Sequence, residues 1–220
     1  SNGPNFQNLP NDKKLKVLGL GEYSIRKALE ATTGRTFIIA DYSGIELVIL
    51  AANSGDKKLM DMIILGDIHT EVTINVLGYK EITQDNRDDQ PHKLWRDAAK
   101  TLSYGIAYGT TGRNISETLN IMLASQGYKI DAAEGDRLIA LWFALFPDVY
   151  AYLKSNADKA VMKGYVTDAW GRRRFWNMET FVDKWKRLAA QREGMNAPIQ
   201  GTSATMTKLA IWLMWQRLNK

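Results

Sequence analysis

Apolar residues recur at intervals of three and four along most of the chain, which is the spacing of one face of an α-helix. Glycine, proline and short polar stretches divide this pattern into separate helices. The predicted helices cover residues 45–52, 57–77 with a break at Gly66-Asp67, 94–108, 114–126, 132–160 with a joint at Phe146-Pro147, 179–196, and 199–219, the last two separated at Pro198.

Two other segments have the pattern of β-strands. Residues 36–40 are apolar and β-branched, which predicts a buried strand. Residues 164–176 alternate in polarity around a turn near Gly171 and are predicted to form a hairpin. Residues 80–92 are expected to be a loop and residues 1–35 to be irregular. The combined pattern predicts an α+β fold that is rich in helix.

Composition narrows the class of protein. The 220 residues are 45% apolar and 10% aromatic, which suits one large or two small folded domains and excludes a disordered chain. No apolar run reaches the roughly 20 residues that cross a bilayer, so no membrane partner is expected. The lack of cysteine excludes a disulfide scaffold, a thiolate zinc site and a cysteine nucleophile. His69 and His92 are the only histidines, which argues against a multi-histidine metal site.

Basic residues are clustered although the net charge is only +5. Three arginines are consecutive and four further cations follow closely: Arg172, Arg173, Arg174, Lys184, Lys186, Arg187 and Arg192. Such a cluster is either a solvated basic face or a phosphate-binding surface, and charge alone leaves both open.

One predicted helix carries a regular stripe of cations and aromatic rings. Arg96, Lys100, Tyr104 and Tyr108 recur every four residues, so they share one slowly winding face. The cations suit a phosphate chain at one end of this face and the rings suit a stacked base at the other. An amphipathic core helix with snorkelling basic residues is the alternative.

Arg192, Asn196 and Gln200 repeat the four-residue spacing later in the chain. Asn and Gln offer both donors and acceptors, which suits sugars or base edges in the minor groove of DNA. Turn chemistry at Asn196 and simple surface exposure of Gln200 are the alternatives. These residues are therefore candidates for DNA contact.

Three acidic or titratable residues stand at other candidate positions. Asp41 follows the predicted strand, where its carboxylate could hold a divalent metal or cap the next helix. Glu46 lies five residues further on in an apolar stretch, where plain exposure on a helix is the alternative. His69 could donate to a phosphate or be structural.

Together these segments resemble the motifs of family A DNA polymerases, the bacterial polymerase I-like family. Six matches occur in family order, namely PNFQNLP at 4–10, DYSGIEL at 41–47 (motif A), GDIH at 66–69, RDAAKTLSYGIAYG at 96–109 (motif B), GRRR at 171–174 and NAPIQGT at 196–202. The resemblance implies helix-rich fingers with part of the antiparallel palm of a right-hand polymerase, and no thumb. Residues 1–50 would be partial palm, 51–195 fingers and 196–220 a palm helix.

The resemblance implies that the chain takes part in template-directed DNA synthesis, with primer–template DNA and dNTPs as partners. Asp41 would bind both of two catalytic Mg²⁺ ions with help from the carbonyl of Tyr42. Lys100 would also protonate the pyrophosphate. Other nucleotide contacts would come from Tyr42, Glu46, His69, Arg96, Tyr104 and Tyr108, and minor-groove contacts from Arg192, Asn196 and Gln200.

Glu46 has a more specific implied role. It would be a steric gate against a ribose 2′-OH and would pack against Tyr108. The chain also departs from the family pattern at four positions, which affects local contacts with sugar or template: Gly44, Val48, Ser103 and Thr205.

One family element has no match. Motif C, of sequence HDE, supplies the second catalytic Asp, but here His69 is followed by Thr70 and His92 by Lys93. One carboxylate anchors two Mg²⁺ ions poorly, so we expect a fragment that is inactive or nearly so by itself. It would need a thumb and a motif C palm segment on other chains. A split or intein-processed gene, a nicked protein or a designed fragment would each give such a chain.

The alternative function is a non-catalytic nucleotide- or DNA-binding module, a polymerase relic. The joint presence of Asp41, Glu46 and the motif B cations disfavours it, because binding alone needs no metal carboxylate. A related template-directed RNA polymerase is disfavoured by Glu46, since a 2′-OH gate excludes ribonucleotides. The polymerase hypothesis implies a cytoplasmic location, in a bacterial cell or a phage-infected host.

Overall fold

The computed structural model describes residues 29–218, and the chain divides into two compact units, Ser1–Ser43 and Gly44–Lys220. Residues 1–28, with the PNFQNLP segment and most of the stretch predicted to be irregular, lie outside the described residues. Residues 29–43, the described part of the first unit, contain neither helix nor strand.

The buried strand predicted over residues 36–40 is therefore wrong. Phe37, Ile38 and Ile39 are all exposed, and Ile39 retains 92% of its accessible surface. A strand needs a neighbour for its backbone hydrogen bonds. The only sheet within residues 29–218 is a separate two-stranded one, so this segment has no described strand to pair with.

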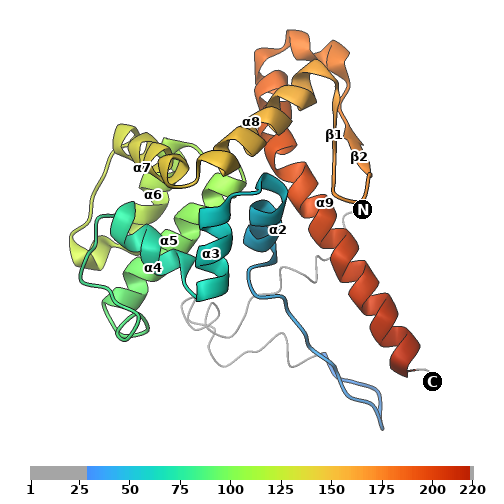
Figure 1. Cartoon of the computed structure of the whole chain (residues 1–220), viewed down its shortest axis with the longest axis horizontal. Coiled ribbons are helices and arrows are strands. Elements are labelled where there is room, and N and C mark those ends of the chain that lie inside the picture. Colours follow the sequence, from blue (N-terminus) through green and yellow to red (C-terminus); the bar gives the residue numbers. More distant parts are fainter. Residues whose placement is uncertain (1–28, 219–220) are drawn as a thin grey trace. The chain divides into compact units, whose positions relative to one another are not determined.

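The second unit contains the helices and the hairpin drawn in Figure 1. Its elements are α2 (Ile45–Ser54), α3 (Lys57–Leu65), α4 (Ile68–Asn75), α5 (His92–Ala107), α6 (Gly112–Met122), η3 (Ala124–Gln126), α7 (Ala132–Leu145), α8 (Pro147–Met162), β1 (Tyr165–Thr167), β2 (Arg173–Phe175), η4 (Met178–Val182) and α9 (Lys184–Leu218). The break at Gly66-Asp67, the joint at Phe146 and the hairpin are confirmed. Tyr165 pairs with Phe175 across the antiparallel hairpin, whose turn contains Gly171 at φ 82°.

Helix α5 forms because its apolar residues recur on one face, and that face is buried in the core. Trp95, Ala98, Leu102 and Ile106 lie on it. Buried Ser103 accepts a hydrogen bond from the indole Nε1 of Trp142 at 3.1 Å, which gives a buried polar group its partner. This contact is a physical reason for serine at a position where the family commonly has asparagine.

Helices α6 and α7 cross at two glycines. A Cβ atom placed on Gly135 would lie 2.1 Å from the carbonyl oxygen of Gly112, and one on Gly112 would lie 2.3 Å from Asp136 Oδ1. The Gly112 N–H donates to that same Asp136 oxygen at 2.9 Å. The two backbones can therefore approach this closely only without side chains at these positions.

Helix α9 corrects the prediction that Pro198 separates two helices. It is continuous from Lys184 to Leu218 and contains Pro198 inside it, while residues 178–182 form the short 3₁₀ helix η4. An internal proline costs a helix roughly 3 kcal/mol. Packing offsets this cost, because Pro198 and Ile199 are buried and Gly194 approaches Ala160 of α8 too closely for a side chain.

Among the described helices, none is by itself long and apolar enough to cross a membrane. Helices α7 and α8 pass that test only when counted together, and they are bent by 110° at the joint between them.

Candidate functional site

The predicted stripe of cations and rings lies along α5, on residues outside the buried apolar face. Lys100 is exposed, and its Nζ lies 6.0 Å from the centroid of the Tyr104 ring. The His69 ring lies 6.3 Å from the same ring, measured between centroids. The structure therefore brings His69 of α4 beside the middle of the stripe, as its assignment to a phosphate-binding group requires.

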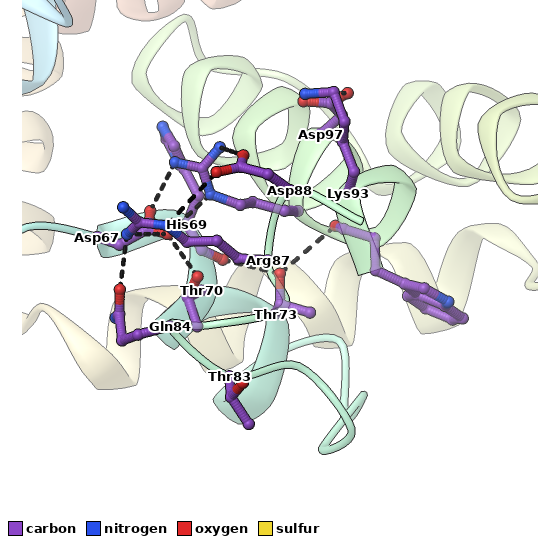
Figure 2. Close-up of polar contacts among 12 residues, drawn as sticks. Asp67, His69, Thr70, Thr73, Thr83, Gln84, Arg87, Asp88, Lys93 and Asp97 are labelled. Carbon is purple, nitrogen blue, oxygen red and sulfur yellow. Dashed lines mark hydrogen bonds and ion pairs between the residues drawn. The ribbon is translucent and has the colours of Figure 1, made fainter. Parts of the chain in front are cut away.

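Arg96, at the first turns of α5, is held by the carboxylate of Asp67. Arg96 donates from Nε to Asp67 Oδ2 at 2.7 Å and from Nη2 to Oδ1 at 3.1 Å. Figure 2 shows Asp67 also beside Arg87 and Thr70, and Arg87 Nη1 lies 3.2 Å from Asp67 Oδ2. Asp67 is thus the centre of a hydrogen-bonded network around one of the predicted phosphate-binding cations.

The charge of Asp67 is fixed by this network. Burial by itself would raise the pKa of the carboxyl, but hydrogen bonds from Arg96 and Thr70 outweigh burial and lower the pKa to about 2. Asp67 is therefore ionised at every physiological pH. The carboxylate also caps α4 by accepting from the His69 backbone N–H.

His69 is neutral at physiological pH. Burial lowers the pKa of its imidazole to about 4, with Arg96 and Lys100 acting in the same direction and Asp67 against them. Its Nδ1 is buried without a hydrogen-bond partner in the part of the chain that the structure describes. A neutral imidazole can still donate one N–H to a phosphate oxygen.

The other end of the stripe is joined to two other helices. The Tyr108 hydroxyl donates to the carboxylate of Glu46, which lies in the first turn of α2. Burial raises the pKa of the Tyr108 phenol, Glu46 raises it further, and a hydrogen bond with Gln200 of α9 opposes them. The structure therefore brings together Glu46, Tyr108 and Gln200, although Glu46 and Gln200 are 154 positions apart in the sequence.

A groove with a volume of about 1300 Å³ continues from Tyr108 between α5, α6, the hairpin and α9. Its lining includes all three predicted DNA-contact residues and the three consecutive arginines: Arg192, Asn196, Gln200, Arg172, Arg173 and Arg174. Glu193 is paired with Arg174 at 2.8 Å and Asp168 with Arg172 at 3.3 Å. A surface of this kind, hollow and rich in arginine, is typical of a nucleic-acid-binding protein.

Asp67 and Asp168 are not among the site residues predicted from the sequence. Asp168 is buried at the start of the hairpin turn, and its Oδ1 accepts from the backbone N–H groups of Trp170 and Arg172 at 3.0 and 2.9 Å. Gly201 of α9 packs so closely that a Cβ there would lie 2.7 Å from Asp168 Oδ2. The Asp168-to-Gly171 spacing is a turn signature that predicts such a loop, but not its contact with α9.

Asp41 and Tyr42 belong to the first unit and are both exposed. The N-cap position of α2 is Gly44 and makes no side-chain capping bond, so the helix-capping alternative for Asp41 is wrong. No group of three or more His, Cys, Asp or Glu side chains that could hold a metal occurs within residues 29–218. The metal-binding roles of Asp41 and Tyr42 stay predictions.

The structure is a helix-rich domain with an arginine-lined groove, and comparison with known proteins gives its family. The model of DNA polymerase family A matches residues 1–220, so the chain belongs to that family. The match confirms the family and fold class inferred from the motifs. The boundaries proposed at residues 50 and 195 between palm and fingers stay predictions.

The alignments with relatives include nearly all of this chain but only a small part of each relative. DNA polymerase I of Thermus aquaticus is 35% identical over 222 residues, which are 100% of this chain and 24% of that protein. DNA polymerase I of Deinococcus radiodurans is 34% identical over 94% of this chain and 20% of its own length. The chain therefore spans about a quarter of the length of these relatives.

A solved structure is similar as well. It is the POL domain of Pol1 from M. smegmatis in complex with DNA primer-template and dNTP. Its TM-score is 0.66 at 29% sequence identity, and the match covers 81% of this chain and 29% of that chain. The fold of the described chain is accordingly that of part of a polymerase domain.

Proposed function

We propose that this chain takes part in template-directed DNA synthesis, the transfer of a dNTP to a primer 3′-OH, as one segment of a family A DNA polymerase. The observation that carries the proposal is the stripe on α5. Its middle lies beside His69, and its aromatic end meets Glu46 and Gln200 next to an arginine-lined groove. A nucleotide would bind along the stripe, and a DNA duplex would bind in the adjacent groove.

The basic end of the stripe would bind the triphosphate of the nucleotide. Arg96, fixed by Asp67, supplies a planar guanidinium that suits phosphate oxygens. Lys100 lies one turn further along α5 and is exposed, so its ammonium can reach a phosphate and donate a proton to the departing pyrophosphate. Neutral His69 would add a hydrogen bond without adding charge.

The aromatic end would select the sugar. Tyr108 holds the Glu46 carboxylate in place, and a fixed carboxylate near the 2′ position of a nucleotide excludes a hydroxyl there by contact. Tyr104 lies close to the start of α2, since its hydroxyl is 3.7 Å from the position of a Cβ on Gly44. The family commonly has glutamine at Gly44, so this chain leaves more space beside Tyr104.

The donor chemistry of Asp41 and Tyr42 fits Mg²⁺, which prefers carboxylate and carbonyl oxygens. Both donors come from consecutive residues, and they supply only part of a site for two ions. When bound, two Mg²⁺ ions stabilise charge on the attacking and leaving oxygens. Asp41 would hold these ions, with the Tyr42 carbonyl as a second oxygen donor.

Further polymerase segments are the proposed partners of the chain. Residues 209–215 of α9 are apolar all round, and the large apolar side chains there and at Leu218 are exposed: Leu209, Ile211, Trp212, Leu213, Met214, Trp215 and Leu218. A helix that is apolar on every side is normally buried in a core. Exposed Phe37, Ile38 and Ile39 in the first unit have the same need for cover. A thumb and a palm segment with motif C would provide this cover and a second carboxylate.

The alternative, a non-catalytic nucleotide- or DNA-binding module, explains the stripe and the groove equally well but gives no role to Asp41. The polymerase proposal also implies that the chain acts in the cytoplasm of a bacterial cell or a phage-infected host.

The groove supplies a direct test of the proposal. We expect the 220-residue chain to bind a primer–template duplex, and Arg192→Gln to weaken binding by about threefold to tenfold while reducing the salt slope by about one unit. Fluorescence anisotropy over a salt series measures both quantities. Arg137→Gln on α7, an exposed arginine outside the groove, is the control. No binding, or equal losses in both variants, would contradict a DNA role for this groove.

Two further variants separate the proposed sugar contacts in an assembled polymerase. A tyrosine hydroxyl at position 104 can partly replace a missing 3′-OH, because one hydrogen bond contributes roughly 0.5–1.5 kcal/mol and an unsatisfied buried partner costs about 1–3 kcal/mol. Tyr104→Phe should therefore raise discrimination against ddNTPs by at least about tenfold. Glu46→Ala should instead relax exclusion of ribonucleotides. Competition between ddNTP, rNTP and dNTP measures both. An unchanged ddNTP ratio in Tyr104→Phe would show that the sugar does not lie at Tyr104.

A further inference from the structure

The loop between α4 and α5, residues 76–91, brings a second guanidinium to Arg96. Arg87 in this loop donates from Nη1 to Asp67 Oδ2 at 3.2 Å and to Gln84 Oε1 at 2.6 Å. Figure 2 shows Arg87 lying across the network from the loop toward Asp67. Two arginines from different elements thus meet at one carboxylate, although Arg87 belongs to none of the six family segments.

One carboxylate cannot neutralise both cations. The Asp67 side chain is 1% exposed and accepts from five donors: the His69 N–H, the Thr70 hydroxyl, Arg87 Nη1 and two Arg96 nitrogens. A carboxylate has about four lone-pair positions, so Asp67 has no capacity left for the remaining donors of the two guanidiniums. The pair therefore keeps an excess positive charge that faces away from Asp67.

Asp88 lies where that excess charge is directed. Its Oδ2 is 3.9 Å from Arg87 Nε and its Oδ1 is 4.0 Å from Arg96 Nη1, so each oxygen faces a different guanidinium. Both distances exceed a hydrogen bond, and the side chain is 72% exposed. Exposed ion pairs of this kind are weak, so a stronger anion can displace the carboxylate.

We propose that Arg87 and Arg96 form a clamp for the terminal phosphate of a nucleotide, and that Asp88 is the resident anion that the phosphate displaces. The clamp rests on the proposed function only in placing the nucleotide phosphates at this end of α5. A phosphate offers three oxygens and a higher charge than a carboxylate, so it can accept hydrogen bonds from both guanidiniums at once. Lys100, one turn further along α5, would then meet the phosphates nearer the sugar.

Calorimetric titration of the 220-residue chain with inorganic tripolyphosphate, at fixed Mg²⁺ concentration, tests the clamp. Arg87→Gln should weaken binding by about fivefold to tenfold, because it removes charge-assisted hydrogen bonds, and Arg87→Lys should recover part of that loss. Asp88→Asn should tighten binding by about threefold, because it removes the competing anion. A purely structural role of the loop would move the affinity of the Asp88 variant downward or not at all.

Matched controls come from an exposed ion pair on α6. Arg113→Gln and Glu117→Gln remove the same charges at a 3.0 Å pair away from the network, and they should leave tripolyphosphate affinity unchanged. Unaltered affinity in Arg87→Gln, absent tightening in Asp88→Asn, or no tripolyphosphate binding by the parent chain would each overturn the clamp. Failure to bind primer–template DNA while the clamp variants behave as expected would instead overturn the polymerase proposal alone.

Discussion

A mixture of this chain with a segment that carries the thumb and the family's second metal carboxylate is expected to extend a primed template, whereas the 220-residue chain alone is not. The reason is the donor count of the proposed metal site. Asp41 and the Tyr42 carbonyl are its only predicted ligands, and no His-Asp-Glu sequence occurs in the 220 residues. A second carboxylate would be needed beside Asp41, because one carboxylate would hold two Mg²⁺ ions poorly.

Primer extension with dNTPs and Mg²⁺ measures this difference, with each component assayed separately and together. Association can be measured independently, because burial of exposed tryptophans such as Trp212 should change their fluorescence. Trp212→Lys should weaken association, while Trp170→Lys on the hairpin serves as a control of similar exposure. Robust extension by the 220-residue chain alone would refute the requirement for a second carboxylate.

The parts of the site that lie on one helix could be predicted from sequence. The stripe of α5 depends only on a four-residue period, and a helix converts that period into a shared face whatever its surroundings. The Tyr108–Glu46 contact joins residues 62 positions apart, and it was expected only because the resemblance to the polymerase family implied it. Local periodicity alone would not have shown it.

The Asp67 network could not be predicted, because its members come from three separate stretches of chain. Arg87 and Arg96 lie 20 and 29 positions from Asp67, and the loop that carries Arg87 has no periodic pattern. The sequence does show Asp67 before a helix, which predicts a cap. The cap is present, and the same carboxylate also holds two arginines, which only tertiary structure shows.

Two predictions from local sequence are wrong: the helix break at Pro198 and the strand over residues 36–40. A proline predicts a helix end from local preference, but α9 continues through Pro198, which is buried, so packing offsets the cost of roughly 3 kcal/mol. An apolar, β-branched segment predicts a strand, but strand formation depends on a pairing partner that residues 29–218 do not provide. In both cases a non-local contact, present or absent, decided the local structure.

Asp41→Ala in the assembled polymerase is expected to lower the rate of primer extension by at least about a thousandfold, equivalent to roughly 4 kcal/mol of transition-state stabilisation. The carboxylate would act on metal-bound oxygens in the transition state, whereas phosphate contacts by Arg192 and the other groove arginines would dominate DNA affinity. Affinity for primer–template DNA should therefore stay within a few-fold of the parent. Loss of a helix cap would not explain such a result, because the N-cap residue of α2 is Gly44 and not Asp41.

Single-turnover extension and anisotropy, measured on the same preparations, separate the two effects. Asp61→Ala on α3 provides a matched control, because it removes an exposed aspartate outside the six family segments. It should change neither quantity. A rate for Asp41→Ala within about tenfold of the parent would show that Asp41 is not the metal carboxylate. An equally large loss of DNA affinity would show instead that Asp41 acts through the fold of the first unit, because a metal ligand in the transition state has little effect on ground-state DNA binding.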